Sequence, residues 1–166
     1  ILFLADELVE ILARALSPGV NDPFTAINCI NWFHSALKQF SKVVEPSPYR
    51  YDEQGDLRLI AYPVTFDQFL DTICDQSRAY IATDRNTSIK MMTVLTEIAA
   101  VVDTKAYKDS VLEQLEKLKT SAEELLPSAV DKAEVRQHYE MSQKMISNPA
   151  YLLEQEHSQD WIAGRG

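Results

Sequence analysis

Four polar side chains lie within nine residues near the start of the chain: Arg14, Ser17, Asn21 and Asp22. If they converge at the beginning of a helix, free backbone N–H groups and the helix dipole would favour an anion there, and Arg14 would add positive charge. Asp22 opposes an anion and would instead act as a base or bind a cation, while Asn21 would hydrogen-bond a substrate. The same residue types also cap helices and form turns, and Arg14 can pair with Glu10. The sequence leaves both interpretations open.

Two helices must position these side chains. Apolar residues recur at helical spacing over residues 2–16, and Pro18 and Gly19 end that pattern. Asn21 or Asp22 is a suitable N-cap, and Pro23 suits the first position of a second helix over about 23–44. We expect that helix to place six apolar residues on one buried face: Phe24, Ile27, Ile30, Phe33, Leu37 and Phe40.

A second candidate is an acidic stripe, Asp67, Asp71 and Asp75, in which successive residues are four apart. This spacing puts three carboxylates on one helical face, and each like-charge pair costs about 0.2–0.5 kcal/mol. Arg78 can pair with Asp75 and is also a candidate member of the ligand site. The stripe predicts a solvated face, a docking face for a basic partner, or a cation site.

Other catalytic and metal-binding patterns are not found, and we expect no metal and no cofactor. Glu154 and His157 have the spacing of a carboxylate-bridged di-iron motif, but no second copy exists. We expect His34 to be partly buried and hydrogen-bonded, and Glu134 and His138 to form a solvated charged pair. The sequence has no Gly-x-Ser-x-Gly elbow and no glycine-rich phosphate loop, so an enzymatic role is not the favoured one.

The remaining pattern predicts a mainly α fold, an antiparallel bundle of about five to six helices with one small β-hairpin near 49–62. We expect the hairpin to pack on the helices or to pair with other strands, because isolated hairpins are marginally stable. Residues 1–150 are predicted to form one helical domain, and residues 151–166, with Trp161, a C-terminal tail. Tyr80, Met91, Met92 and Tyr107 have core-like spacing. The further helices are expected over about 66–82, 86–102, 105–126 and 129–147.

Composition limits the possible partners. The net charge of −9 argues against nucleic acid and against direct binding of this chain to an anionic membrane surface. No run of 18 apolar residues is present, which predicts no membrane span. Cys29 and Cys74 are predicted to be buried thiols, consistent with a reducing compartment. The chain begins within an amphipathic pattern, and we expect further chain upstream.

The run from Arg14 to Ala26, Arg-Ala-Leu-Ser-Pro-Gly-Val-Asn-Asp-Pro-Phe-Thr-Ala, resembles the signature of a bacterial family of predicted membrane proteins with a domain of unknown function. Cys29 and Ile30 continue the resemblance, and a helix with Phe66, Asp75, Gln76 and Arg78 is similar to a second, weaker pattern. The resemblance covers residues 1 to about 105. It implies several N-terminal transmembrane helices followed by a soluble part to which this chain corresponds.

The chain also departs from that family pattern. Glu10 and Asn31 stand where the family is expected to have Asp, and Leu4 and Asp6 where it is expected to have Gly and a basic residue. If the expected acids form a site, Asn31 weakens that site here.

Two hypotheses follow. The first is an extramembranous, non-enzymatic domain that serves assembly or regulation, including ligand sensing, with its own N-terminal membrane region as partner, a possible homo-oligomer, and a cytoplasmic location. The second is a small-ligand-binding or enzymatic domain with a site at residues 14–26. The geometry of the turn discriminates between them, because a binding site requires these side chains to point into one pocket.

Overall fold

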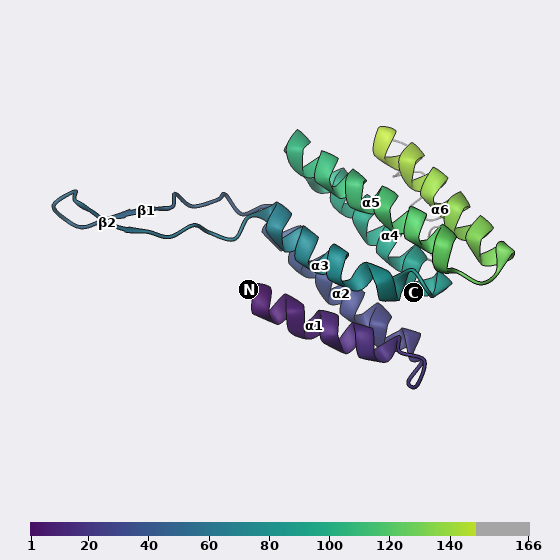
Figure 1. Ribbon diagram of the computed structural model, residues 1–166. Coiled ribbons are helices and arrows are strands. Elements are labelled where there is room, and N and C mark those ends of the chain that lie inside the picture. The colour runs from purple at the N-terminus through teal and green to yellow at the C-terminus, as the bar shows by residue number, and fades with distance from the viewer. Residues whose placement is uncertain (149–166) are drawn as a thin grey trace.

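A computed structural model describes residues 1–148 of the chain (Figure 1). The described part contains six α-helices and one two-stranded antiparallel sheet, so the predicted mainly α fold with one small hairpin is confirmed. The predictions about Trp161 and about Glu154 with His157 concern residues outside the described part. The elements in chain order are α1 (Leu2–Ala15), α2 (Pro23–Phe40), β1 (Tyr49–Tyr51), β2 (Leu57–Ile60), α3 (Phe66–Ile81), α4 (Arg85–Val101), α5 (Lys105–Leu125) and α6 (Ala129–Ser147).

Side-chain caps begin four of the helices. Asp22, Asp84 and Ser128 accept hydrogen bonds from backbone N–H groups in the first turns of α2, α4 and α6. Thr65 and Gln68 form a reciprocal capping box at the start of α3, as their spacing predicts. Each cap satisfies donors that the helix itself leaves unpaired, and this is why the predicted starts of these helices agree closely with the observed ones.

The end of α2 is less well predicted. The helix stops at Phe40, whereas the apolar pattern predicts a helix to residue 44. Phe40 is the last residue of α2 that packs on the core, with its ring centroid 5.1 Å from that of Phe69. Val43 and Val44 lie beyond it with side chains 55% and 88% exposed, so little burial supports another helical turn.

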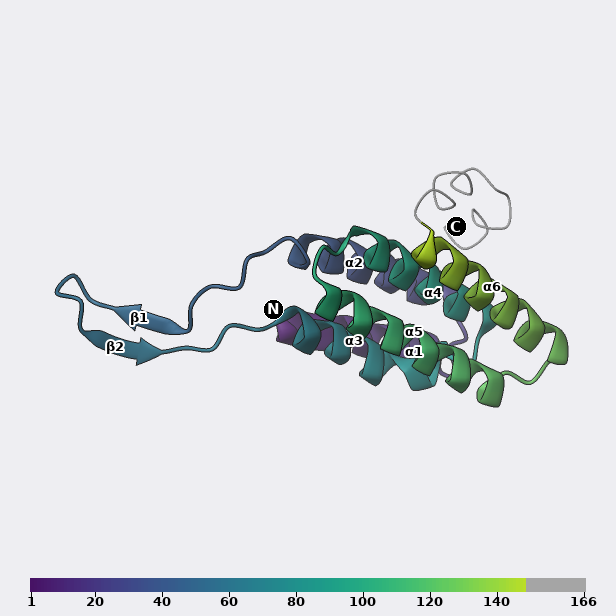
Figure 2. The same cartoon turned by 90° about the horizontal axis from the view of Figure 1, so that it is seen from above.

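The helices form two layers (Figures 1 and 2). Consecutive helices run in opposite directions, as the short connections predict. Helix α3 packs between α1 and α5 in one layer, while α4 packs between α2 and α6 in the other. The described chain is therefore a short stack of three helical hairpins, α1–α2, α3–α4 and α5–α6, and neighbours within one layer point the same way.

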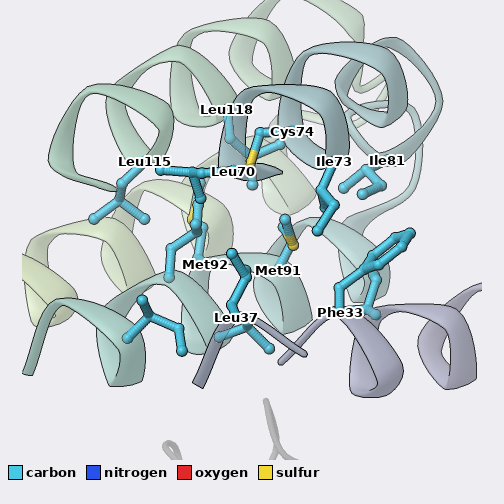
Figure 3. Packing of buried hydrophobic residues seen from close by; sticks show 14 of the residues in the cluster. Phe33, Leu37, Leu70, Ile73, Cys74, Ile81, Met91, Met92, Leu115 and Leu118 are labelled. Atoms are coloured by element: carbon cyan, nitrogen blue, oxygen red, sulfur yellow. The ribbon is translucent and has the colours of Figure 1, made fainter. Parts of the chain in front are cut away.

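The core runs along the interface of the two layers. Phe33 and Leu37 of α2, Leu70 of α3, Met92 of α4 and Leu115 of α5 meet there and are essentially inaccessible to solvent (Figure 3). Met91 and Met92 occupy core positions, as predicted. Replacing one of these large side chains by Ala would cost roughly 2–5 kcal/mol, because the packed neighbours collapse only partly into the cavity.

Two predicted core positions are wrong. Phe24 is 77% exposed, because the inward face of α2 is formed by Ala26, Cys29, Ile30, Phe33 and Leu37. Tyr80 is 43% exposed at the end of α3. Both residues fit the helical period loosely, and only the directions of the neighbouring helices exclude them from the core.

The β1–β2 hairpin projects away from the helices as an arm (Figures 1 and 2). Tyr49 pairs with Ile60 and Arg50 with Leu59, and a bulge follows Arg50. Every strand residue is exposed, so the expectation that the hairpin packs on these helices is wrong. The stability of such an arm is marginal, because two strands alone bury little apolar surface.

None of the helices in residues 1–148 combines the length and apolar character needed to cross a membrane.

Cys29 and Cys74 are buried free thiols, as predicted. Burial raises the pKa of both thiols, so both are held in the neutral form.

Candidate functional site

The turn between α1 and α2 is held by its own backbone. The Asn21 and Val20 N–H groups donate to the Ser17 carbonyl at 2.9 and 3.0 Å, and the Asp22 N–H donates to the Ala15 carbonyl at 2.8 Å. Asn21 has a φ of +48°, and it is the one non-glycine residue within 1–148 in the left-handed region. Asn tolerates this conformation better than other side chains do, so the residue type suits a backbone requirement.

Asp22 is the N-cap of α2. Its Oδ1 accepts from the Thr25 backbone N–H at 3.1 Å and its Oδ2 from the Thr25 hydroxyl at 2.6 Å. The hydrogen bonds from the Thr25 hydroxyl and backbone lower the pKa of Asp22, which keeps the carboxylate charged near the positive end of the helix dipole. A carboxylate held in this way is a weak base.

Arg14, Ser17 and Asn21 do not meet Asp22 at a common point. The Arg14 guanidinium donates to Glu10 Oε1 at 2.6 Å, and both side chains are mostly exposed. The Ser17 hydroxyl donates to the Arg14 carbonyl at 2.7 Å. The exposed Asn21 side chain forms no hydrogen bond within the described part of the chain. These contacts are those of a helix–turn–helix connection, and ligand binding at residues 14–26 stays a prediction.

Arg78 lies in a different environment. Its Nη1 donates to Asp75 Oδ1 at 2.5 Å and to Gln114 Oε1 at 3.3 Å, which places it between α3 and α5 and not at the turn. Partial burial would raise the pKa of Asp75, but the hydrogen bond and charge of Arg78 outweigh it and lower that pKa. The ion pair predicted from the three-residue spacing is confirmed.

The acidic stripe faces α5. Gln114 Nε2 donates to Asp71 Oδ1 at 2.9 Å while its Oε1 accepts from Arg78, so one buried amide links Asp71, Arg78 and Asp75. Asp67 Oδ1 is buried without a hydrogen-bond partner among the described residues. Two of the three carboxylates thus contribute to the α3–α5 contact. A docking or cation-binding role for Asp67, Asp71 and Asp75 stays a prediction.

Sequence reasoning missed Gln114. It lies between Val111, Leu115 and Leu118 on the inward face of α5, and a polar residue inside that apolar pattern was the available signal. A small hollow adjoins it and is lined by Cys74, Arg78 and Leu118 among others, with room for about one water molecule.

A second cluster of polar side chains lies around α4, in the layer formed by α2, α4 and α6. Thr93 Oγ1 is 3.0 Å from His138 Nε2, and His138 is buried, so the prediction of a solvated Glu134–His138 pair is wrong. Glu134 instead pairs with Arg85 across to α4. Burial lowers the pKa of His138 to about 4, which keeps the imidazole neutral.

His34 is partly buried, and its Nε2 lies 3.3 Å from Glu97 Oε2, as the expectation of a paired side chain requires. Residues 1–148 contain no group of three His, Cys, Asp or Glu side chains that could hold a metal ion.

Residues 1–97 match the model of a family described as "Predicted membrane protein (DUF2254)". The chain belongs to this family. The match spans α1 to α3 and most of α4, including the 14–26 turn, Arg78 and the acidic stripe, whereas Gln114 and His138 lie outside it.

Relatives in mycobacteria carry no functional description. The chain is 35% identical over 75 residues to uncharacterized proteins of Mycobacterium bovis (Mb1321c) and Mycobacterium tuberculosis (Rv1290c). The matched stretch covers 45% of this chain and 14% of each relative, so the chain spans a small part of their length. No solved structure matches the chain.

Proposed function

We propose that this chain is an extramembranous domain of a bacterial membrane protein, on the cytoplasmic side, and that it serves assembly or regulation. Membership of a predicted membrane protein family supports the first point, together with described helices that are unsuited to crossing a membrane. Two buried free thiols are consistent with a reducing compartment. The membrane region of the same protein is the proposed first partner.

The β1–β2 arm is the observation that carries this proposal. Tyr49, Tyr51, Leu57, Leu59 and Ile60 are each between 46% and 61% exposed on two short strands. The hydrogen bonds of the strands and their turn stay within residues 47–61, so the helices contribute none of them. Apolar side chains on a projecting hairpin with two open edges favour a partner that covers the side chains and extends the sheet.

The base of the arm is connected to the helical core, which supports a regulatory role. Tyr107 of α5 stacks on Phe66 at 4.5 Å, and its hydroxyl donates to Glu45 at 2.9 Å, just before the arm begins. Phe66 is buried and opens α3 directly after the arm ends. A partner that shifts the arm would thus act on the α3–α5 contact through two adjacent aromatic rings.

Hydrogen–deuterium exchange tests this proposal. Backbone amides of 49–51 and 57–60 should exchange rapidly in this chain alone and at least about tenfold more slowly in the full-length membrane protein in nanodiscs, because docking removes local opening. Amides in the middle of α4 serve as the internal reference, since they are buried in both samples.

A double substitution, Tyr51→Ser with Leu57→Ser, should abolish the added protection while leaving α4 unchanged. Equal exchange of the arm in both samples would exclude the arm as the contact with the membrane region and remove the main support for an assembly role.

A further inference from the structure

The stack of three helical hairpins has two ends, α1–α2 and α5–α6, which differ in the side chains that they expose. In stacked helical arrays each unit contacts only its neighbours, and a terminal unit needs a polar outer face to remain soluble. At the α5–α6 end polar side chains occupy the middle of α5, and the exposed apolar residues Leu125 and Val130 lie beside the α5–α6 connection. Gln114 of α5 faces α3, and Glu116 and Glu123 follow it by two and nine residues, which places them on the opposite side of α5. Glu116 contacts Tyr139 of α6, and Glu123 contacts Arg136 of α6.

The α1–α2 end carries apolar side chains instead. Asp6 bonds Gln76 of α3 at 3.0 Å, and Leu4, two residues away, therefore points to the opposite side of α1. His34 pairs with Glu97 of α4, so Trp32 points to the opposite side of α2. Leu4 and Trp32 are 64% and 67% exposed, and Ile11, one heptad after Leu4, is 45% exposed.

Leu4, Glu7, Ile11 and Arg14 form one stripe along α1, which we call the α1 stripe. Their spacings of three, four and three residues keep them on one side of the helix. The order is apolar, acidic, apolar, basic. If two such stripes lie antiparallel with their centre near Ile11, Glu7 of each copy faces Arg14 of the other and the two Ile11 side chains meet. The stripe is therefore complementary to itself in charge, with the Ile11 side chains of the two copies at its centre.

We propose that the α1–α2 end of the stack binds a second copy of this chain about a two-fold axis that crosses α1 near Ile11. The axis sets α1 antiparallel to its counterpart and brings Trp32 of α2 into the contact. The inference rests on the proposed assembly function and names the partner and the surface.

Charge supports a second copy as the occupant. Glu7 forms no ion pair among the described residues, and the Arg14–Glu10 pair is exposed, so Arg14 can take a further carboxylate at little cost. A symmetric contact of this kind makes every favourable pair twice.

The area sets the expected strength. Fourteen residues of α1 give a length of about 21 Å, and two helices side by side give a width of about 20 Å, or roughly 420 Å² of projected area per copy. Two copies together then contribute roughly 840 Å², which is below the usual size of stable interfaces, so we expect a weak dimer with a dissociation constant in the upper micromolar range.

Sedimentation equilibrium of the 166-residue chain at micromolar concentrations, combined with native mass spectrometry, tests the proposal. The chain should be in monomer–dimer exchange, and Ile11→Glu should be monomeric. Val130→Glu is the matched control, because Val130 is 66% exposed on α6 at the other end of the stack. It should dimerise like the unmodified chain. A monomeric unmodified chain overturns the proposal, as does equal dimerisation of Ile11→Glu.

A charge exchange tests the antiparallel arrangement itself. Glu7→Arg and Arg14→Glu should each weaken the dimer by about tenfold or more, because each places like charges opposite one another twice. The double variant should recover most of the affinity. Failure of recovery in a double variant with native circular dichroism overturns this arrangement. Loss of the dimer and loss of arm protection are separate results, so failure here leaves the proposed contact with the membrane region standing.

Discussion

Asn21 illustrates how one residue can be explained by the backbone or by a ligand. Its φ of +48° is compatible with Asn and Gly but strained for β-branched residues. We expect Asn21→Gly to change the free energy of unfolding little and Asn21→Val to lower it by roughly 1–3 kcal/mol in urea denaturation.

The glycine variant also tests ligand binding at the 14–26 turn, because it keeps the turn but removes the amide. A small molecule retained by the unmodified chain in native mass spectrometry and lost from folded Asn21→Gly would establish a binding role. If the unmodified chain and Asn21→Gly give the same native mass spectra, Asn21 has a conformational role alone.

His138 predicts a pH dependence of stability. Burial lowers its pKa from 6.5 to about 4, so the unfolded chain binds the proton more tightly than the folded one. The contribution of neutral His138 to the free energy of unfolding is complete above pH 6.5 and is lost progressively as the pH falls toward 4. The full loss is about 3 kcal/mol, of which most is reached by pH 4.5.

Denaturant titrations from pH 7 to pH 4.5 measure this loss, with His138→Gln as the control. Glutamine can still hydrogen-bond Thr93 but does not titrate. A variant with the same steep pH dependence as the unmodified chain would assign the effect to other groups.

At the scale of the helices, the buried side-chain amide of Gln114 joins α5 to α3. Gln114→Ala would leave Asp71 and Arg78 without their shared partner, and we expect a loss of about 1–3 kcal/mol in the free energy of unfolding. Gln137→Ala on the exposed side of α6 is the matched control and should be near neutral. Equal effects of the two substitutions would show that the α3–α5 network contributes no stability.

Helix starts were more predictable than helix ends and faces. The capping box of Thr65 and Gln68 is encoded within four residues, so the sequence suffices there. For α2 the sequence left Asn21 and Asp22 as alternative caps, and the structure selects Asp22. The end of α2 depends on where Phe69 lies, and the exposure of Phe24 depends on the direction of α4, neither of which is local information. The hairpin pattern predicted β1 and β2 but not their projection from the helices.

At the scale of the whole molecule, the packing of three helical hairpins into two layers explains both the buried polar contacts and the exposed ends. Helix α4 is surrounded by α2, α5 and α6, which buries His138 of α6 and places it within hydrogen-bonding distance of Thr93 of α4. Among residues 1–148 the α1–α2 hairpin has neighbouring helices on one side, and Leu4, Ile11 and Trp32 are exposed on it. At the α5–α6 end the exposed apolar residues Leu125 and Val130 lie beside the connection of the two helices, whereas Leu4 and Ile11 lie along α1.

The sequence by itself determined a mainly α fold of about five to six helices, the capping box of Thr65 and Gln68, the hairpin, the burial of Cys29 and Cys74 and the resemblance to the family, because these depend on spacing over a few residues. Only the tertiary structure separated Arg78 from the 14–26 turn, placed Gln114 against the acidic stripe and buried His138. These results depend on which helices become neighbours, and residues tens of positions apart in the chain decide that.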